Sequence, residues 1–151
     1  MRNRQKMKVS HPLRLMIVLM LGLFVMGCDI DKVEIETAQD IAFEILGAGP
    51  WSLGDGAGSI LVDGTNVSAN YPGFSLTIGN GTYSTINADD LFSASGTWEW
   101  IDDEATMIRL DDGKELSIVT LNQFRFTFTF SLADGGVRAG IPGNYTVSVV
   151  Q

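Results

Sequence analysis

The chain has 151 residues, and its 18 Asp and Glu residues outnumber its 10 Lys and Arg residues, which gives a formal net charge of −8 at pH 7. This acidic balance argues against a nucleic-acid partner, because phosphate binding requires clustered basic side chains. The length supports one domain with a single hydrophobic core.

The N-terminal region combines a basic segment with an apolar one. Leu15–Gly27 is an uninterrupted run of about 13 apolar or small residues, the length of the hydrophobic region of a secretory signal. A membrane-spanning helix needs about 20 such residues, so a cleaved leader is favoured over a permanent span. The preceding segment carries five basic side chains: Arg2, Arg4, Lys6, Lys8 and Arg14.

The run Val25-Met26-Gly27-Cys28 closes this segment and resembles the lipobox of bacterial lipoproteins. The resemblance implies that residues 1–27 are the signal peptide. It also implies that Cys28 becomes the first mature residue and carries a diacylglycerol and an N-linked acyl chain such as palmitate. Two or more acyl chains make a stable membrane anchor, whereas one chain binds only marginally. The alternative is a thiol that is removed with an ordinary signal peptide.

After cleavage, five basic residues would remain against all 18 carboxylates, a net charge of −13. We therefore expect the lipid, rather than attraction to anionic headgroups, to hold the protein at the membrane. Residues 28–36 form a short acidic tether. Asp29 resembles an inner-membrane retention signal, whereas acidic residues near the anchor resemble surface-export signals of Bacteroidetes lipoproteins. The expected location is the cell envelope, at the outer membrane or cell surface, with the inner membrane as the alternative.

Residues 37–46 form the one predicted helix. Thr37 can cap its N-terminus together with Asp40, and Gly47 is a natural stop. We expect this helix to cover one end of the β domain that follows. Three apolar residues share one face at helical spacing: Ile41, Ile45 and Leu46.

From Trp51 onward the apolar period changes to two, which is typical of strands. The row Phe124, Phe126, Phe128, Phe130 and Leu132 alternates with polar residues and is the clearest strand. Asn80-Gly81, the acidic clusters and Asn122-Gln123 mark turns, and a Gly-rich loop spans residues 133–143. Eight or nine short strands are expected, among them residues 74–78, 83–86, 95–101, 105–110, 114–121, 124–132 and 144–150.

The short turns between consecutive strands predict an all-β fold with an antiparallel meander. A meander of this length avoids exposed edges by closing on itself. We therefore predict a small up-and-down barrel with one short N-terminal helix, and a flattened β-sandwich is the alternative.

The strand motifs of Trp51–Gln151 resemble those of lipocalin-like lipoproteins of the Bacteroidetes type. This resemblance implies that residues 37–151 form a lipocalin-like β domain. Because its motifs are mostly turn and core residues, the resemblance bears on fold rather than on activity. The residues that carry it are Gly79-Asn80-Gly81-Thr82-Tyr83, Ser95-Gly96-Thr97-Trp98, Ile108-Arg109-Leu110, and Leu116-Ser117-Ile118 through Phe128.

Few residues of the mature chain suit nucleophilic or metal chemistry. The single histidine, His11, lies in the leader, which removes Ser-His and Cys-His pairs and Cys/His zinc sites. We expect no enzyme, no catalytic residue, no metal and no cofactor. Three acidic clusters could hydrolyse glycosides or bind calcium, but each lies at a predicted turn, where Asp bonds the local backbone. These clusters are Asp89-Asp90, Asp102-Asp103-Glu104 and Asp111-Asp112.

Aromatic side chains are the remaining candidates for a binding site. Trp98, Trp100, Phe126 and Phe128 could line a cavity for a small ligand, or they could fill the core. Arg109 and Arg125 lie on predicted polar faces, where a surface position is expected and an anion contact is the alternative. The pattern favours an interaction or structural module of the cell envelope that binds an envelope protein. The alternative is a lipocalin-like binder of a small apolar or amphipathic ligand.

Overall fold

The structure is a computed structural model that describes residues 35–88, 90–133 and 141–151. The chain divides into two compact units, Met1–Ile35 and Glu36–Gln151, and the helix and strands described here belong to the second. The expected leader, the lipidation site Cys28 and the tether up to residue 34 lie outside the described residues. Asp89 and residues 134–140 of the Gly-rich loop also lie outside them.

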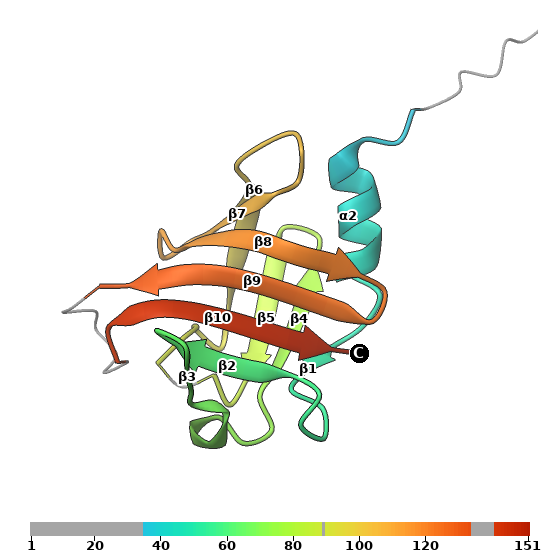
Figure 1. The fold of residues 1–151 in the computed structure, drawn as a ribbon. Helices are drawn as coiled ribbons and strands as arrows, with labels where there is room; N and C mark the ends of the chain where they lie inside the picture. Colours follow the sequence, from blue (N-terminus) through green and yellow to red (C-terminus); the bar gives the residue numbers. More distant parts are fainter. Residues whose placement is uncertain (1–34, 89, 134–140) are drawn as a thin grey trace, which may run out of the picture. The chain divides into compact units, whose positions relative to one another are not determined.

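The described part of residues 36–151 forms an antiparallel sheet with one α-helix, α2 (Ala38–Leu46), and a short 3₁₀ turn, η2 (Ser68–Asn70) (Figure 1). Ten strands lie within the described residues, one or two more than expected. They are β1 (Trp51–Ser52), β2 (Ser59–Val62), β3 (Thr65–Asn66), β4 (Ser75–Gly79), β5 (Thr82–Ile86), β6 (Ser95–Trp100), β7 (Met107–Leu110), β8 (Glu115–Asn122), β9 (Arg125–Leu132) and β10 (Gly143–Val150).

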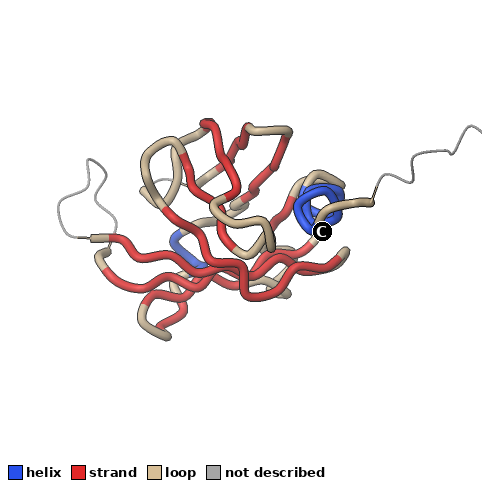
Figure 2. Tube along the Cα trace, turned by 90° about the horizontal axis from the view of Figure 1, so that it is seen from above, coloured by secondary structure: helices blue, strands red, loops and turns tan. Residues whose placement is uncertain are grey.

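The sheet closes into a barrel because β1 pairs with strands on both of its sides. Trp51 lies opposite Leu76 of β4, and Ser52 lies opposite Val150 of β10. Eight strands therefore form the ring, β1 and β4 through β10, in chain order. The β2–β3 hairpin extends the sheet along β10, so the order departs from a plain meander only there. The predicted closed antiparallel barrel is confirmed, and Figure 2 shows α2 beside the C-terminus at one end of it.

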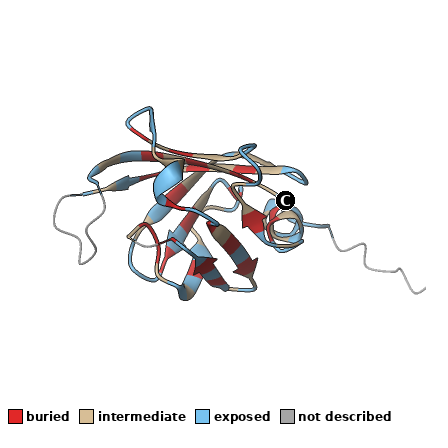
Figure 3. Cartoon of the chain, turned by 90° about the horizontal axis from the view of Figure 1, so that it is seen from below, coloured by how far each residue is buried: buried red, intermediate tan, exposed pale blue. Residues whose placement is uncertain are grey.

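Strand alternation directs every second side chain into the core, as the bands of buried and exposed residues in Figure 3 show. Phe126, Phe128 and Phe130 of β9 are all buried. The β10 residues opposite Phe126 and Phe128, Val149 and Val147, are also buried. Each such side chain contributes about 1.5–3 kcal/mol when it leaves water, so this strand pair forms a central part of the core.

Phe124 does not join the apolar row of β9, and that part of the prediction is wrong. Asn122 pairs with Arg125, so the two-residue connection is Gln123-Phe124 rather than Asn122-Gln123. The Asn122 side-chain oxygen accepts hydrogen bonds from the backbone N–H groups of Phe124 and Arg125, both at 3.0 Å. Phe124 is therefore fixed in a tight turn, 77% exposed.

The N-terminus of α2 has the predicted capping box. The Asp40 N–H donates to Thr37 Oγ1 at 3.1 Å, and the Thr37 N–H donates to Asp40 Oδ2 at 3.0 Å. These bonds satisfy two of the backbone donors that a helix start leaves free. The Thr37 hydroxyl also donates to Asp40 Oδ2 at 2.7 Å, and this bond, followed by the one from the Thr37 backbone N–H, holds the pKa of Asp40 below its usual value.

The buried face of α2 differs from the predicted one. Ala42 and Leu46 are buried, whereas Ile41 is 49% exposed. Adjacent helix positions are about 100° apart, so a short helix that packs along Ala42 and Leu46 turns Ile41 outward. The Trp51 indole N–H donates to the Leu46 carbonyl at 2.9 Å, and α2 covers one end of the barrel as expected.

Two strand details also differ from the predicted pattern. The last strand before the Asp111 turn begins at Met107 rather than at Ala105, because Ala105 has a φ of +57° and belongs to the preceding turn. In β8 the register shifts between Ile118 and Thr120, which leaves Val119 as an extra residue that is 62% exposed. Such a bulge turns a side chain out of the alternating pattern.

Candidate functional site: the barrel interior and its two ends

The centre of the barrel is filled by aromatic rings. Trp51, Phe126 and Phe128 have no exposed surface. Their ring centroids are 5.8 Å apart for Trp51 and Phe126 and 4.7 Å apart for Phe126 and Phe128. A side chain without accessible surface borders no space large enough for a water molecule, so this part of the interior has the close packing of a protein core.

The four candidate ligand-binding residues fall into two separate pairs. Phe126 and Phe128 contact each other in the interior, whereas Trp98 and Trp100 form an edge-to-face pair on β6, with centroids 5.0 Å apart. Trp98 is 8% exposed, and its ring lies 6.3 Å from Phe43 of α2.

Trp98 also uses its polar atom inside the fold. Its indole N–H donates to the carbonyl oxygens of Gly79 and Thr82, at 2.9 and 3.0 Å. These two residues flank the predicted Asn80-Gly81 hairpin, in which Gly81 adopts a φ of +65° that glycine accepts readily. The indole therefore holds the β4–β5 turn and has no donor left for a ligand.

A loop closes the barrel near the C-terminal half of β9, and we call its described residues, 87–88 and 90–94, the plug loop. Leu91 is 0% exposed and Phe92 is 3% exposed. The Phe92 ring lies 6.1 Å from Phe128 and 5.1 Å from Phe130. The plug loop thus extends the aromatic core beyond the strands, a feature that the sequence reasoning missed. In the sequence, the only local sign of this loop is the pair Leu91-Phe92, two large apolar residues within an otherwise polar turn.

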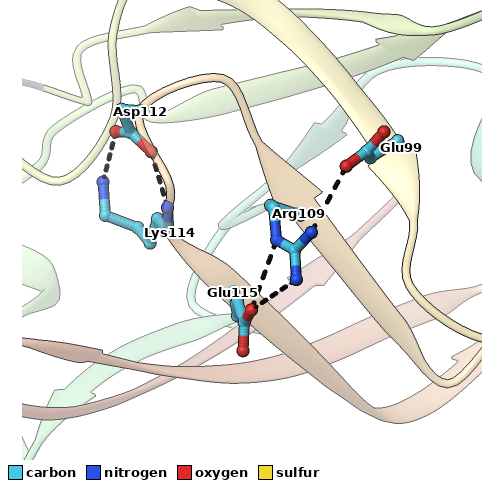
Figure 4. Close-up of polar contacts among 5 residues, drawn as sticks. All are labelled: Glu99, Arg109, Asp112, Lys114 and Glu115. Carbon is cyan, nitrogen blue, oxygen red and sulfur yellow. Dashed lines mark hydrogen bonds and ion pairs between the residues drawn. The ribbon is translucent and has the colours of Figure 1, made fainter.

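Lys114 holds the plug loop in place. Its Nζ donates to the Leu91 carbonyl at 2.7 Å and lies 3.0 Å from Asp112 Oδ2. The same atom lies 5.1 Å from the centre of the Phe92 ring and 5.8 Å from that of Phe130, within range of a cation–π interaction. Only 11% of the side chain is exposed, so this lysine is structural rather than a free surface cation (Figure 4).

The three tyrosines of the chain are all partly withdrawn from water. Tyr71 donates to Asp90 at 3.1 Å and Tyr83 donates to Asp111 at 3.4 Å. Burial raises the pKa of Tyr71, Tyr83 and Tyr145, and the negative charges of Asp90 and Asp111 raise it further. Each phenol therefore favours its neutral form in the folded protein.

Several described carboxylates of the acidic clusters hydrogen-bond to other residues of the fold. Asp102 accepts hydrogen bonds from both the hydroxyl and the backbone N–H of Thr106, which lowers the pKa of the carboxyl. Asp111 accepts from Tyr83, and Asp112 accepts from Lys114. In the described ranges, no group of three or more His, Cys, Asp or Glu side chains is arranged to hold a metal ion.

The two candidate arginines lie on the outside of the barrel, as expected. Arg109 lies between Glu115, at 2.9 Å, and Glu99, at 3.5 Å, on three neighbouring strands (Figure 4). All three side chains are well exposed, so these ion pairs contribute little to the stability of the fold. Arg125 donates to the Ser148 hydroxyl at 2.6 Å and extends the polar face of β9 and β10.

The interior formed by the described residues offers no polar group in need of a partner. Among the described residues, every fully buried side-chain nitrogen or oxygen has a hydrogen-bond partner. A pocket built for a polar ligand would present such groups toward the ligand. The chemistry that the described interior can supply is therefore apolar packing.

Across residues 35–88, 90–133 and 141–151, no helix has the length and apolar character needed to cross a membrane. Comparison of the chain with known protein families gave no match. Comparison with curated protein sequences gave none either.

Proposed function

We propose that this chain is a lipid-anchored protein of the cell envelope whose barrel is a non-enzymatic interaction or structural module. The anchor rests on the leader and on the lipobox pattern that ends at Cys28. The module rests on one observation above all, the complete burial of Phe126 and Phe128. Rings that are packed on all sides present no free face to a ligand, so binding would take place on the outer surface.

The described carboxylates support a role without catalysis. Asp102, Asp111 and Asp112 each bond a neighbouring turn or strand residue. A carboxylate pair that hydrolyses glycosides instead faces an open cleft, with one acid group kept protonated by a raised pKa. The pKa of Asp102 is shifted in the opposite direction.

Native mass spectrometry of the full chain, extracted from its own membrane, tests this proposal. We expect a polypeptide that begins at Cys28, the added mass of its acyl groups, and a protein partner in fixed stoichiometry. The matched control is Cys28→Ser, which should lose both the acyl mass and retention in the membrane fraction. An unmodified N-terminus downstream of Cys28 would contradict the anchor. Separation of inner and outer membranes distinguishes the outer-membrane location that we favour from the inner one.

A second candidate function is binding of a small apolar or amphipathic ligand inside the barrel. The observation that favours it is the plug loop, because one end of the core is closed by Leu91 and Phe92 of a loop rather than by strands. Outward movement of that loop would uncover the rings of Phe128 and Phe130, which Phe92 now contacts. Recovery of a lone monomer with a retained metabolite would favour this function over the first.

A further inference from the structure

A small apolar groove lies on the outer surface where α2 meets the β8–β9 hairpin, and we call it the α2–hairpin groove. It has a volume of about 540 Å³, with Ile41, Ile45, Ala48 and Phe124 as its apolar lining. Figure 1 shows the β8–β9 connection and the C-terminus beside the C-terminal end of α2. Two segments about 80 residues apart in the sequence therefore build one apolar surface.

Two large apolar side chains of the groove are held outward by the fold. Phe124 is 77% exposed, and its turn is fixed by the two hydrogen bonds to the Asn122 side chain. Ile41 is 49% exposed on a helix whose capping box fixes the first turn. Both exposed side chains leave apolar surface in water, and removal of that surface from water would be favourable.

We propose that the α2–hairpin groove inserts into the surface of the lipid bilayer to which Cys28 is attached. This inference rests on the proposed function. The tether from Cys28 to Thr37 reaches at most roughly 30 Å when fully extended. The anchor therefore keeps α2 close to the bilayer at a high effective concentration, so that even a weak contact becomes populated.

The size of the groove favours a bilayer over a protein partner. A stable protein interface needs roughly 20–30 residues on each side, whereas the apolar lining of the groove consists of four. A bilayer accepts single side chains, because an apolar face enters only about 5–10 Å into the boundary between headgroups and acyl chains.

The charge of the groove favours a neutral bilayer surface. Glu44 lies at its edge, and its lining includes no Lys or Arg. Attraction to anionic lipid requires basic side chains near the membrane surface. We therefore expect binding to phosphatidylcholine, and weaker binding when phosphatidylglycerol is added.

The test uses tryptophan variants of the full lipidated chain in phosphatidylcholine vesicles with brominated acyl chains, which quench nearby tryptophan. Phe124→Trp is the reporter, and Ile86→Trp is the control, since Ile86 is 62% exposed and lies outside the groove. We expect about a twofold loss of the added fluorescence for Phe124→Trp, because its ring would lie near the acyl chains. We expect no loss beyond that of the wild type for Ile86→Trp.

Flotation of the same samples with the vesicles separates failure of the anchor from failure of the groove. If the chain does not float, the proposed function is wrong and the groove assignment falls with it. If the chain floats and both variants are quenched equally, the anchor stands and the groove assignment is overturned. A third outcome is a dimer that cross-links through the groove while the tryptophan of Phe124→Trp is not quenched. This outcome would assign the groove to a second copy of the chain and would also overturn the proposal.

Discussion

Removal of the Lys114 ammonium group should release the plug loop and destabilise the barrel. Lys114→Met keeps most of the aliphatic side chain but deletes the hydrogen bond to the Leu91 carbonyl, the ion pair with Asp112 and the contact with the Phe92 ring. A hydrogen bond from a charged donor contributes about 1.5–3 kcal/mol. The cation–π contact adds about 0.5–1 kcal/mol. The ion pair adds little, because Asp112 is 37% exposed.

Taken together, these contributions predict a loss of about 2–4 kcal/mol in the free energy of unfolding. For a domain of this size, 1 kcal/mol corresponds to roughly 4 °C in Tm, so Tm should fall by about 8–16 °C. Urea unfolding and thermal melts followed by circular dichroism measure the two quantities. Hydrogen exchange should also speed up at the Leu91 amide, which bonds Ala88 within the plug loop.

Arg109→Met is the matched control for this experiment. It also removes a cation that pairs with acidic side chains, but this side chain is 45% exposed and its partners, Glu99 and Glu115, lie on β6 and β8 rather than in the plug loop. The expected loss is much smaller than that of Lys114→Met, because exposed ion pairs contribute little, and Leu91 exchange should not change. If Lys114→Met cost no more than Arg109→Met, the argument that Lys114 holds the barrel end would be refuted.

Three further predictions follow from the core and its turns. Phe128→Ala should lower the free energy of unfolding, measured in urea, by about 3–5 kcal/mol. Phe128→Leu is a milder variant to use if the alanine variant does not fold. A loss of under about 1 kcal/mol for Phe128→Ala would mean that the interior is hollow. Gly58→Ala should lower the free energy of unfolding by about 1–3 kcal/mol, because a Cβ there would lie 2.5 Å from the Ser148 carbonyl oxygen. Gly49→Ala is the control, since its Cβ would have its nearest contact at 3.9 Å, and it should be nearly neutral in the same assay. Since the folded-state pKa of every tyrosine is raised above 10.0, their stabilising effect is complete below pH 10.0 and is lost as the pH rises through the folded values. Absorbance at 295 nm should therefore show no tyrosinate just above pH 10.0 while the chain is folded. Titration of Tyr71, Tyr83 or Tyr145 near pH 10.0 in the native protein would contradict this prediction.

The elements that could be predicted from the sequence are those that local chemistry determines. The alternation through Phe126 and Phe128 predicts a strand because one face must be buried. Asn80-Gly81 predicts a hairpin because the turn requires a positive φ, which Gly81 adopts at +65°. Thr37 and Asp40 predict a helix start because their side chains bond each other's backbone N–H groups.

The elements that were missed depend on partners distant in the chain. β1 has only the residues Trp51–Ser52, too few for a period, and is defined by its pairing with β4 and β10. Ile41 was expected on the buried face of α2 but is exposed. Helical spacing shows which residues share a face, but packing against the barrel decides which face of a short helix is buried. Phe124 fits the two-residue alternation of apolar side chains along β9, but the pairing of Asn122 with Arg125 places it in the turn before that strand.

The plug loop and its lysine could not be predicted for a related reason. Acidic residues and Ser93 around Leu91 and Phe92 indicate a turn, and a turn is normally solvated. The contact between Lys114 and Leu91 spans 23 residues and exists only because β6, β7 and the turn before β8 bring these segments together. Whether the aromatic candidates fill the core or line a cavity depends on their exposed fractions, which the sequence does not give: Phe126 and Phe128 are 0% exposed and Trp98 is 8% exposed.

Closure through β10 has a consequence for the order of assembly. Gly143–Val150 pairs with β9, β2 and β1, and the pair Ser52 and Val150 is separated by almost the whole length of the domain. The ring therefore cannot be completed until the final strand is available to pair. Under the lipid anchoring proposed above, Cys28 lies at the opposite end of the chain from this strand, so the protein would be attached to the membrane before its barrel closes.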